Sequence, residues 1–441
     1  MALTPTIAVL GASGLIGQGV AEDLLRGGYP VVAIARRFTP AQRAMFGAAG
    51  VEAPIVELGA NHLAALLAER GASIVLNCVG VLQDGPRGRT ADVHAGFVQR
   101  LVLALKASRT PALLLHVSIP GEAGDDATAF SRSKRAAEAT IRASGLTYAI
   151  LRPGFVIAPA ASGGSALVRA LAALPIGLDR WTAAQPFTPT ALGDLAATVR
   201  AAAGLWPEHW PADGAVWDVM ARQAPTVGEV VAAFRARFGG PRTVLTPPGW
   251  LLGLAARLGD VAGWLGWSPP VRSTALAELR RGVQGDPRGW IGATGIEPMT
   301  LAGALGAVPS TVQERWFARL YLLKGAILAG LSLFWLLSGA IALGPGFSPA
   351  AAVLARHSAP PSWAGALTIV TALADIAIGL GIALRRSCRA ALITGTGLAL
   401  GYLAAASLVA PDLWLDPLGP LVKVGPVVLL MLAALAILPE R

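Results

Sequence analysis

The chain has few charged residues and very few cysteines for its length. Only 14% of its 441 residues are Asp, Glu, Lys or Arg, whereas 54% are hydrophobic, which is far from the composition of an ordinary soluble protein. Its two cysteines, Cys78 and Cys388, exclude a framework of several disulfides and a zinc site built from four cysteines. We therefore expect part of the chain to lie in lipid and the rest to face a reducing compartment.

Acidic residues are outnumbered by basic ones, and the formal net charge is +10. The basic residues are scattered, and their best-defined cluster, at residues 385–389, separates two long apolar runs. This placement is typical of membrane topology rather than of a nucleic-acid surface, so no nucleic-acid partner is expected. Residues 1–5 hold neither a basic region nor an apolar one, so we expect no signal peptide there and a cytoplasmic first domain.

The first strongly patterned stretch, residues 6–25, combines an apolar run, a glycine cluster and one apolar helix face. Strand, glycine-rich turn and helix in this order form the phosphate-binding unit of dinucleotide-binding folds. Gly11 permits the sharp turn, Gly14 lets the backbone approach a pyrophosphate, and Gly17 lets the helix lie close to the strand. The amides at the helix N-terminus face the anion. Cofactor contacts are therefore expected from Gly11, Ser13, Gly14, Leu15, Ile16 and Gly17.

The second predicted strand, residues 31–35, is followed by Arg36 and Arg37. An acidic residue at this place binds the ribose 2′-hydroxyl of NAD, whereas arginine suits the 2′-phosphate of NADP. The sequence therefore favours NADP(H) over NAD(H) as the cofactor. Two solvated arginines at the end of a strand are the alternative interpretation.

Further apolar strands alternate with helices, at residues 54–58, 73–80, 112–118 and 146–156. This alternation predicts an α/β fold with a doubly wound parallel sheet of the Rossmann type. Open parallel sheets bind ligands at the carboxyl ends of their strands. More cofactor contacts are expected there, from Leu58, Asn77, Cys78, Val79 and Gly80.

Five motifs in the first 160 residues belong together: Gly11-x-x-Gly14-x-x-Gly17, Asn77-Cys-Val-Gly80, His116-Val-Ser118, Ser131-x-Ser133-Lys134 and Leu151-Arg-Pro-Gly-Phe155. With them the chain resembles the atypical and extended short-chain dehydrogenase/reductase families, close to the branch of the NADPH-binding accessory subunit of respiratory complex I. The resemblance implies a hydride-transfer site made of a Ser, a Tyr and a Lys four residues after the Tyr. Ser118 and Lys134 match this pattern as catalytic residues, but the Tyr position is Phe130. Lys134, Pro153 and Phe155 are also implied as cofactor contacts.

Phenylalanine has no proton to exchange, so the usual acid–base step of these families cannot run at Phe130. Tyr29 precedes the second strand and Tyr148 lies within the sixth, and neither is an obvious replacement. Lys134 can still hydrogen-bond a nicotinamide ribose, and Ser118 can still orient a carbonyl. Cofactor binding therefore survives the loss of the tyrosine better than catalysis does.

Two stretches outside these motifs allow more than one interpretation. Asp92 and His94 precede a helix, where a capping or solvated role is expected. Residues 248–267 are rich in Leu and Trp with few charges, as an interfacial membrane segment would be. An ordinary helix packed on the sheet explains residues 248–267 equally well. We also expect a strand at 215–219 and a helix at 227–238.

Four long apolar runs follow, at residues 320–343, 363–384, 390–409 and 418–438. Each is close to the roughly 20 residues that span a bilayer as a helix. Together with the junction at residues 312–324, they resemble the DoxX-like four-helix membrane domain, which is fused to such a reductase domain in some bacterial proteins. The positive-inside rule then predicts both termini and the loop at 385–389 on the cytoplasmic side of a bacterial inner membrane.

Three ionisable side chains interrupt the apolar runs. Lys324 and Lys423 lie near run ends, where their ammonium groups can reach the membrane surface. Asp375 lies near the middle of the second run, so it should face the bundle interior and either be protonated or pair with a partner such as one of the lysines. A hydrogen-bonding link between helices and a transport or redox role both fit Asp375.

These patterns predict three domains: an NAD(P)-binding Rossmann domain at 1–200, the remainder of the reductase domain with a substrate lobe at 201–315, and a transmembrane domain at 316–441. The first hypothesis is a membrane-anchored NADP(H)-dependent oxidoreductase for a hydrophobic small molecule, with quinones among the candidates, held at the lipid bilayer. The second is a protein that binds NADP(H) without turning it over. The third is a membrane domain that transports or binds a ligand while the reductase domain senses redox state.

Overall fold

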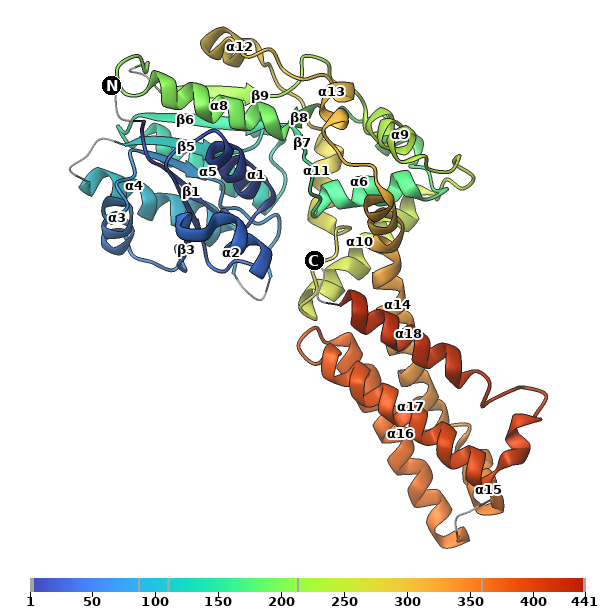
Figure 1. Ribbon diagram of the computed structural model, residues 1–441. Helices are drawn as coiled ribbons and strands as arrows, with labels where there is room; N and C mark the ends of the chain where they lie inside the picture. The colour runs from blue at the N-terminus through green and yellow to red at the C-terminus, as the bar shows by residue number, and fades with distance from the viewer. Residues whose placement is uncertain (1–3, 86–87, 109–111, 212–213, 358–359, 439–441) are drawn as a thin grey trace. The chain divides into compact units, whose positions relative to one another are not determined.

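The computed structural model describes residues 4–85, 88–108, 112–211, 214–357 and 360–438. The chain divides into two compact units (Figure 1). The N-terminal unit comprises residues 1–260 and 270–318, and the C-terminal unit comprises residues 261–269 and 319–441. The short segment 261–269 thus belongs with the last third of the chain rather than with its sequence neighbours.

The N-terminal unit is built on a parallel sheet of seven strands in the order β3-β2-β1-β4-β5-β6-β9. Strands β2 and β3 lie on one side of β1, and the later strands lie on the other. The direction of winding therefore changes between β1 and β4, where doubly wound sheets bind nucleotides. This confirms the predicted fold class. The strands are β1 (Ile7–Leu10), β2 (Val31–Ala35), β3 (Gly50–Glu52), β4 (Ile74–Asn77), β5 (Leu113–Val117), β6 (Tyr148–Pro153) and β9 (Ala215–Val219).

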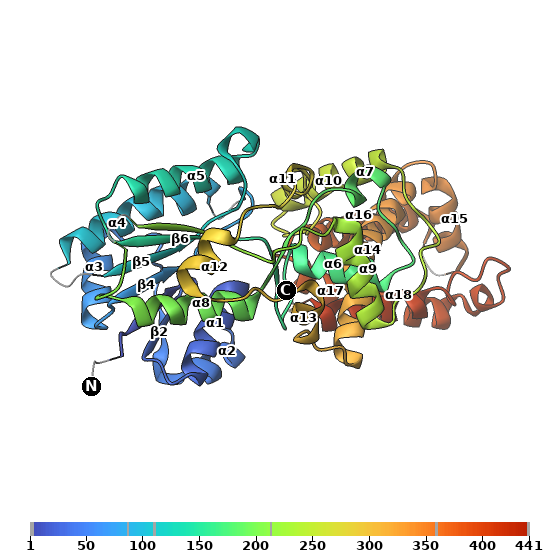
Figure 2. The same cartoon turned by 90° about the horizontal axis from the view of Figure 1, so that it is seen from above.

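Helices cover both faces of this sheet, because side chains on both faces of every central strand are apolar. Helices α4 and α5 lie on one side and α1 and α8 on the other (Figure 2). The covering helices are α1 (Leu15–Arg26), α3 (Ala60–Glu69), α4 (Phe97–Ala107), α5 (Ala129–Arg142), α8 (Leu192–Leu205) and α12 (Arg288–Thr294), with α2 (Pro40–Phe46) near β3 and a π-helical turn at Asp92–Gly96.

A smaller lobe follows the sheet and has an apolar core of its own. Gly154 marks the entry to it, since a Cβ there would lie 2.1 Å from the carbonyl oxygen of Thr188. The lobe contains the paired strands β7 (Phe155–Ile157) and β8 (Pro189–Ala191), and the helices α6 (Gly164–Ala173), α7 (Arg180–Ala183), α9 (Val227–Phe238) and α13 (Leu301–Gly306); α10 (Gly249–Trp264) and α11 (Ser273–Arg281) lie between α9 and α12 in the sequence. The strand predicted at 215–219 and the helix predicted at 227–238 are both confirmed.

The C-terminal unit is helical, and three of its helices are long and apolar enough to cross a membrane. The fourth, α18, has 14 residues, or about 21 Å at 1.5 Å per residue, which is short of the ~30 Å hydrocarbon core. Among the described residues, three helices are therefore long enough to span the bilayer, whereas four were expected. The structure also has a short helix at residues 347–357, between the first and second spans, which was not predicted. The elements are α14 (Val312–Leu343), α15 (Phe347–His357), α16 (Pro361–Ala383), α17 (Cys388–Val409) and α18 (Val424–Ile437).

The third strand is also not where the sequence places it. The prediction was residues 54–58, but β3 is Gly50–Glu52 and residues 55–58 form a turn. Pro54 cannot donate a hydrogen bond to a sheet ladder, and Ile55 fills the core from the turn, where it is buried. The apolar pattern at 54–58 therefore reports burial rather than a strand.

Candidate functional site

The glycine loop between β1 and α1 is closed by two very tight approaches. Gly11 has a φ of +83°, and a Cβ there would lie 3.1 Å from the backbone of Cys78 and Val79 at the end of β4. A Cβ at Gly17 would lie 2.4 Å from the carbonyl oxygen of Gly11. Gly14 is the N-cap of α1. Gly11 and Gly17 thus allow β1, the end of β4 and the start of α1 to lie close together, and α1 begins there with backbone amides that its own turns cannot pair.

Gln42 braces this loop, and the sequence analysis missed it. Its amide nitrogen donates to the Ser13 carbonyl oxygen at 3.2 Å and to the Gln18 side chain at 2.8 Å. Gln42 is buried, and it also forms a capping box with Thr39 at the start of α2. The Thr-Pro-Ala-Gln sequence is a recognisable capping signal, but its link to the glycine loop depends on the fold.

Arg36 and Arg37 follow β2 directly and are both exposed. The nearby acidic residue, Glu52 at the end of β3, already accepts hydrogen bonds from the Phe38 amide at 2.8 Å and from Arg43 at 2.9 Å. The Phe38 and Arg43 hydrogen bonds hold the pKa of Glu52 below its ordinary value. The edge that faces an adenosine ribose in dinucleotide folds therefore presents two guanidinium groups and a carboxylate that is occupied elsewhere.

Asn77 shapes the turn that ends β4. Its side-chain oxygen accepts from the Val79 amide at 3.0 Å, and its amide group donates to Nδ1 of His116 at 3.1 Å on the neighbouring strand. His116 therefore carries its proton on Nε2, and burial keeps its pKa well below the ordinary value. Burial also raises the pKa of Cys78 to about 12. Cys78 is accordingly a thiol and not a nucleophile.

Lys134 and Ser118 meet at the carboxyl ends of β4 and β5. Lys134 Nζ donates to the Val117 carbonyl oxygen at 2.9 Å, and a Cβ on Gly80 would lie 3.4 Å from the same Nζ. Burial lowers the pKa of Lys134 to about 8. The Ser118 hydroxyl is buried and has no hydrogen bond of good geometry within the described chain, although it lies close enough to Glu138 to help lower the pKa of that carboxyl.

His94 is buried rather than solvated, which corrects the expectation for this residue. Nε2 of His94 accepts from the Val81 amide at 3.1 Å, so Nδ1 carries the proton and donates to Ser133 Oγ at 2.8 Å. Ser133 in turn donates to the Phe130 carbonyl oxygen at 2.8 Å. Burial and the charge of Lys134 lower the pKa of His94 to about 3. The sequence could not show this burial, because the partners of His94 lie 13 and 39 residues away along the chain.

Phe130 occupies the turn of α5 before Lys134, and its ring meets that of His94 edge-on with centroids 5.6 Å apart. Among the described residues of the N-terminal unit, no tyrosine lies at this edge. Tyr148 begins β6 and Tyr29 precedes β2, so both lie at the opposite, amino-terminal edge of the sheet. The other two tyrosines of the chain lie on α14 and α17. Neither nitrogen of the neutral His94 is available as a proton donor, since one accepts a bond and the other is engaged by Ser133.

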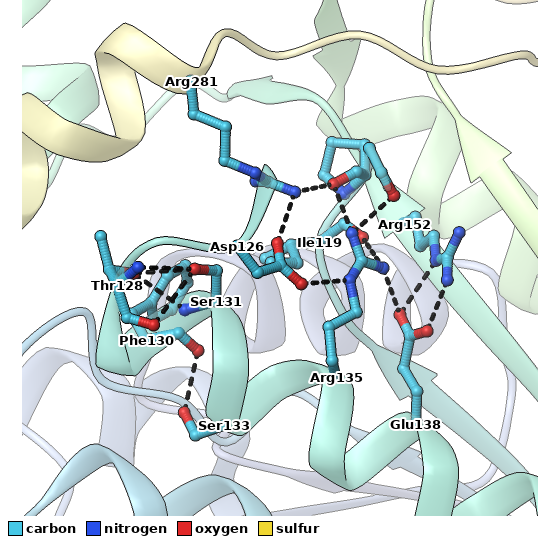
Figure 3. Close-up of polar contacts among 12 residues, drawn as sticks. Ile119, Asp126, Thr128, Phe130, Ser131, Ser133, Arg135, Glu138, Arg152 and Arg281 are labelled. Atoms are coloured by element: carbon cyan, nitrogen blue, oxygen red, sulfur yellow. Dashed lines mark hydrogen bonds and ion pairs between the residues drawn. The ribbon is translucent and has the colours of Figure 1, made fainter. Parts of the chain in front are cut away.

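A buried charge network fixes the loop that follows Ser118 (Figure 3). Asp126 pairs with Arg135 at 2.9 Å and with Arg281 at 3.0 Å, and Glu138 pairs with Arg135 and with Arg152. Arg135 also donates to the carbonyl oxygens of residues 119–121. The loop after β5 is therefore held by α5 and α11 and is preorganised.

The remaining predicted site residues lie along the same edge or near it. Leu58 is half-buried in the turn after β3. Pro153 ends β6, and Phe155 begins β7, where its ring stacks on Phe187 with centroids 4.4 Å apart. Among the described residues, no group of three or more His, Cys, Asp or Glu side chains could hold a metal ion.

Two families match separate parts of the chain. Residues 11–173 match a family described as NAD(P)H-binding, and residues 332–432 match the DoxX-like family. No curated protein matches the sequence at a significant level.

Solved structures resemble the N-terminal part. One is a UDP-glucuronic acid 4-epimerase from Bacillus cereus in complex with UDP-glucuronic acid and NAD, with a TM-score of 0.51 and 16% identity over 72% of this chain and 99% of that one. Another is a human epimerase family protein with NADPH, with a TM-score of 0.50 and 20% identity over 69% of this chain and 98% of that one. At such identities the likeness shows the fold alone.

Proposed function

We propose that this chain, in which an NAD(P)-binding Rossmann domain precedes a DoxX-like domain, is a membrane-anchored NADP(H)-dependent oxidoreductase for a hydrophobic acceptor such as a quinone. The observation that carries the proposal is the grouping of Ser118, Lys134 and Gly80 beside the glycine loop, with Phe130 where the related families have their proton donor. Ser118 and Lys134 are retained, and only the acid is lost.

The residues at this edge fit a dinucleotide. Gly11, Gly14 and Gly17 would let a pyrophosphate approach the backbone amides of the loop, and Arg36 and Arg37 are exposed where a 2′-phosphate would lie. Lys134 is buried beside Gly80, within reach of a nicotinamide ribose. A bound NADPH supplies a hydride. The buried Ser118 hydroxyl, which lies near Glu138, remains to orient the acceptor.

The missing acid restricts the acceptor. Reduction of a simple aldehyde or ketone produces an alkoxide, which is too basic to form without a proton donor at the oxygen. Neither Phe130 nor the neutral His94 can supply that proton. A quinone gives a delocalised anion on hydride addition, and water can protonate this anion afterwards. The overall reaction balances as NADPH, quinone and one proton giving NADP⁺ and quinol.

The three apolar helices of this chain favour a quinone as the acceptor, because they would keep the site close to molecules dissolved in lipid. We place the protein in a bacterial inner membrane with the N-terminal unit on the cytoplasmic side. Arg385, Arg386 and Arg389 in the loop between α16 and α17 favour this orientation by the positive-inside rule.

The test uses the full-length protein in detergent. NADPH binding is measured by fluorescence, and NADPH oxidation is followed at its absorbance band with a short-chain quinone and with an aliphatic aldehyde. We expect binding, with oxidation by the quinone and none by the aldehyde. Faster turnover with the aldehyde would contradict the acceptor class, and an absence of NADPH binding would contradict the whole proposal.

A second candidate is a protein that binds NADP(H) without turnover. The observation that favours it is the Phe130 and His94 pair, because Phe130 has no hydroxyl proton and the Nδ1 proton of His94 is engaged by Ser133. In that case the same experiment shows NADPH binding but no oxidation with any quinone, even at high acceptor concentration.

A further inference from the structure

Helix α10 buries its small residues and exposes its large apolar side chains, which is unusual for a soluble protein. The side that packs on the protein is made of small residues, Ala256, Gly259 and Gly263, which are all buried. A Cβ on Gly259 would lie 1.9 Å from the carbonyl oxygen of Val271. Soluble amphipathic helices bury their large apolar side chains and expose small or polar ones. Here the arrangement is reversed.

The large apolar side chains of this segment are exposed together. Their spacing follows successive helical turns, so they form one continuous stripe. Trp250 is 68% exposed, Leu258 62% and Trp264 84%. Arg257 is the one charged residue on this side of the helix. The stripe consists of Trp250, Leu251, Leu254, Leu258, Val261, Trp264 and Leu265. Monomeric soluble proteins rarely expose so large a contiguous apolar patch.

The residues at the end of α10 and just after it form contacts within the C-terminal unit. Residues 261–269 belong to the C-terminal unit, and within it the Trp267 indole donates to the carbonyl oxygen of Ala383 at 2.7 Å. The Arg385 amide donates to the Leu265 carbonyl oxygen at 3.0 Å, and the Arg385 guanidinium lies 5.1 Å above the Trp267 ring. Ala383 is the last residue of the apolar helix α16. Residues 265–267 therefore lie at the level where that helix leaves the hydrocarbon.

We propose that the stripe on α10 lies in the surface of the lipid bilayer, so that α10 is an interfacial membrane helix. Three observations point to lipid as its occupant: the exposed stripe, the contact of its last residues with the end of α16, and the arginines Arg257 and Arg385 beside it, which suit anionic headgroups. Tryptophan at both ends of the helix is typical of the membrane interface. The proposal adopts the first of the two interpretations that the sequence left open for residues 248–267.

Spin-label accessibility tests the proposal in the full-length protein. Cys78 and Cys388 are replaced by Ser and Ala, and a nitroxide is attached at Leu258→Cys on the stripe. Leu103→Cys is the matched control, because Leu103 is an exposed leucine, 58% accessible, on α4. The labelled proteins are placed in nanodiscs that contain anionic lipid, and collisions with oxygen and with a water-soluble nickel chelate are compared.

We expect the label at position 258 to collide with oxygen more often than with the chelate, and the label at position 103 to show the reverse. Equal chelate access at both positions would overturn the proposal. Protection of position 258 from both probes would also overturn it, because a second protein copy would then cover the stripe. Should Leu258→Cys fail to fold, Val261→Cys gives the same comparison. NADPH binding is measured on the protein that keeps Cys78 and Cys388, and it reports on the proposed function separately, so the two failures are distinguishable.

Discussion

At the residue scale, the proposed choice of acceptor depends on Phe130. Its place on α5 puts a side chain at position 130 one helical turn before Lys134 and in contact with His94. A phenol there would be a proton donor, and the positive charge of Lys134 would lower its pKa towards the working range. Phe130→Tyr should therefore create aldehyde reduction with NADPH, which absorbance can follow.

The matched control is the double variant Phe130→Tyr with Lys134→Met. It keeps the phenol but removes the ammonium group, so the new activity should be lost. Aldehyde reduction by the unchanged protein, unaffected by Phe130→Tyr, would mean that another group donates the proton and that the assignment of Phe130 is wrong.

Arg36 and Arg37 carry the proposed preference for NADP(H). A charged hydrogen bond to phosphate contributes about 1.5–3 kcal/mol, so replacing both arginines by Ala should weaken NADPH binding more than ~10-fold. NADH binding should hardly change, since NADH lacks the 2′-phosphate. Fluorescence titration with both nucleotides measures this, and Arg26→Ala on the far end of α1 is a suitable control. Equal affinity of the unmodified protein for NADH and NADPH would refute the preference.

Some residues of the site could be predicted from the sequence and others could not. The glycines, Asn77, Ser118 and Lys134 stand in local motifs whose spacing fixes their place at the end of a strand or the start of a helix. Gln42 and His94 act across long sequence separations, since Gln42 braces Ser13 and His94 reaches Ser133. No local pattern reports such contacts.

At the scale of the element, α5 is held to the sheet through Glu138. This carboxylate is 4% exposed and pairs with Arg135 and Arg152. Glu138→Gln would leave two largely buried guanidinium groups with less compensation, which costs about 3–5 kcal/mol. A thermal unfolding transition whose midpoint rises when NADPH is added reports on the N-terminal unit. In Glu138→Gln, the midpoint of this transition should move to a clearly lower temperature. Glu69→Gln, at an exposed site, should leave it unchanged.

The ion pairs of Glu138 with Arg135 and Arg152 also predict how the stability of the folded protein depends on pH. Burial opposes ionisation of Glu138, but the Arg152 hydrogen bond and the neighbouring charges outweigh it, so its pKa is lowered in the folded protein. A lowered pKa means that the stabilisation is present above the unfolded-state value of about 4.3 and is lost as the pH falls through the folded-state pKa. When the free energy of unfolding is measured from pH 7 downwards, its decrease below about pH 4.3 should be smaller in Glu138→Gln than in the unmodified protein. An unchanged acid profile would refute this role.

Strands and helices were predicted correctly where the periodicity of the apolar residues and the length of the run indicate the same element. The strand at 215–219 and the helix at 227–238 have both, and the structure has them at those residues. The turn at 55–58 is apolar because it is buried, and hydropathy alone cannot separate burial from extension. The run at 418–438 contains Pro420 and Pro426 and begins with turns, so only 14 of its residues are helical.

At the scale of the whole molecule, composition indicates the two-part design before any motif does. The N-terminal unit places its apolar residues in a closed core, whereas the apolar helices of the C-terminal unit face outwards along most of their length. Such a surface is stable only in lipid. The reversed pattern of α10 belongs to the second kind of surface, although most of that helix lies in the N-terminal unit.

Asp375 tests whether the membrane helices take part in the reaction. As expected, it faces the bundle interior at 8% exposure, but its carboxylate accepts hydrogen bonds from Ser338 on α14 at 3.0 Å and Tyr402 on α17 at 3.4 Å. Lys324, one of the expected partners, donates to the Leu438 carbonyl oxygen instead. Asp375 therefore joins α16 to two neighbouring helices through hydroxyl groups.

This geometry favours a structural link. Asp375→Asn keeps the size of the side chain and one accepting oxygen, so the variant should insert normally, lose on the order of 1 kcal/mol of bundle stability, and oxidise NADPH at the unmodified rate. Ser338→Ala and Tyr402→Phe, which each remove one donor, should behave alike. If Asp375→Asn folds and binds NADPH but loses quinone reduction or proton uptake while both donor variants keep them, the ionisable proton of Asp375 is required. The membrane helices would then be part of the catalytic apparatus rather than an anchor.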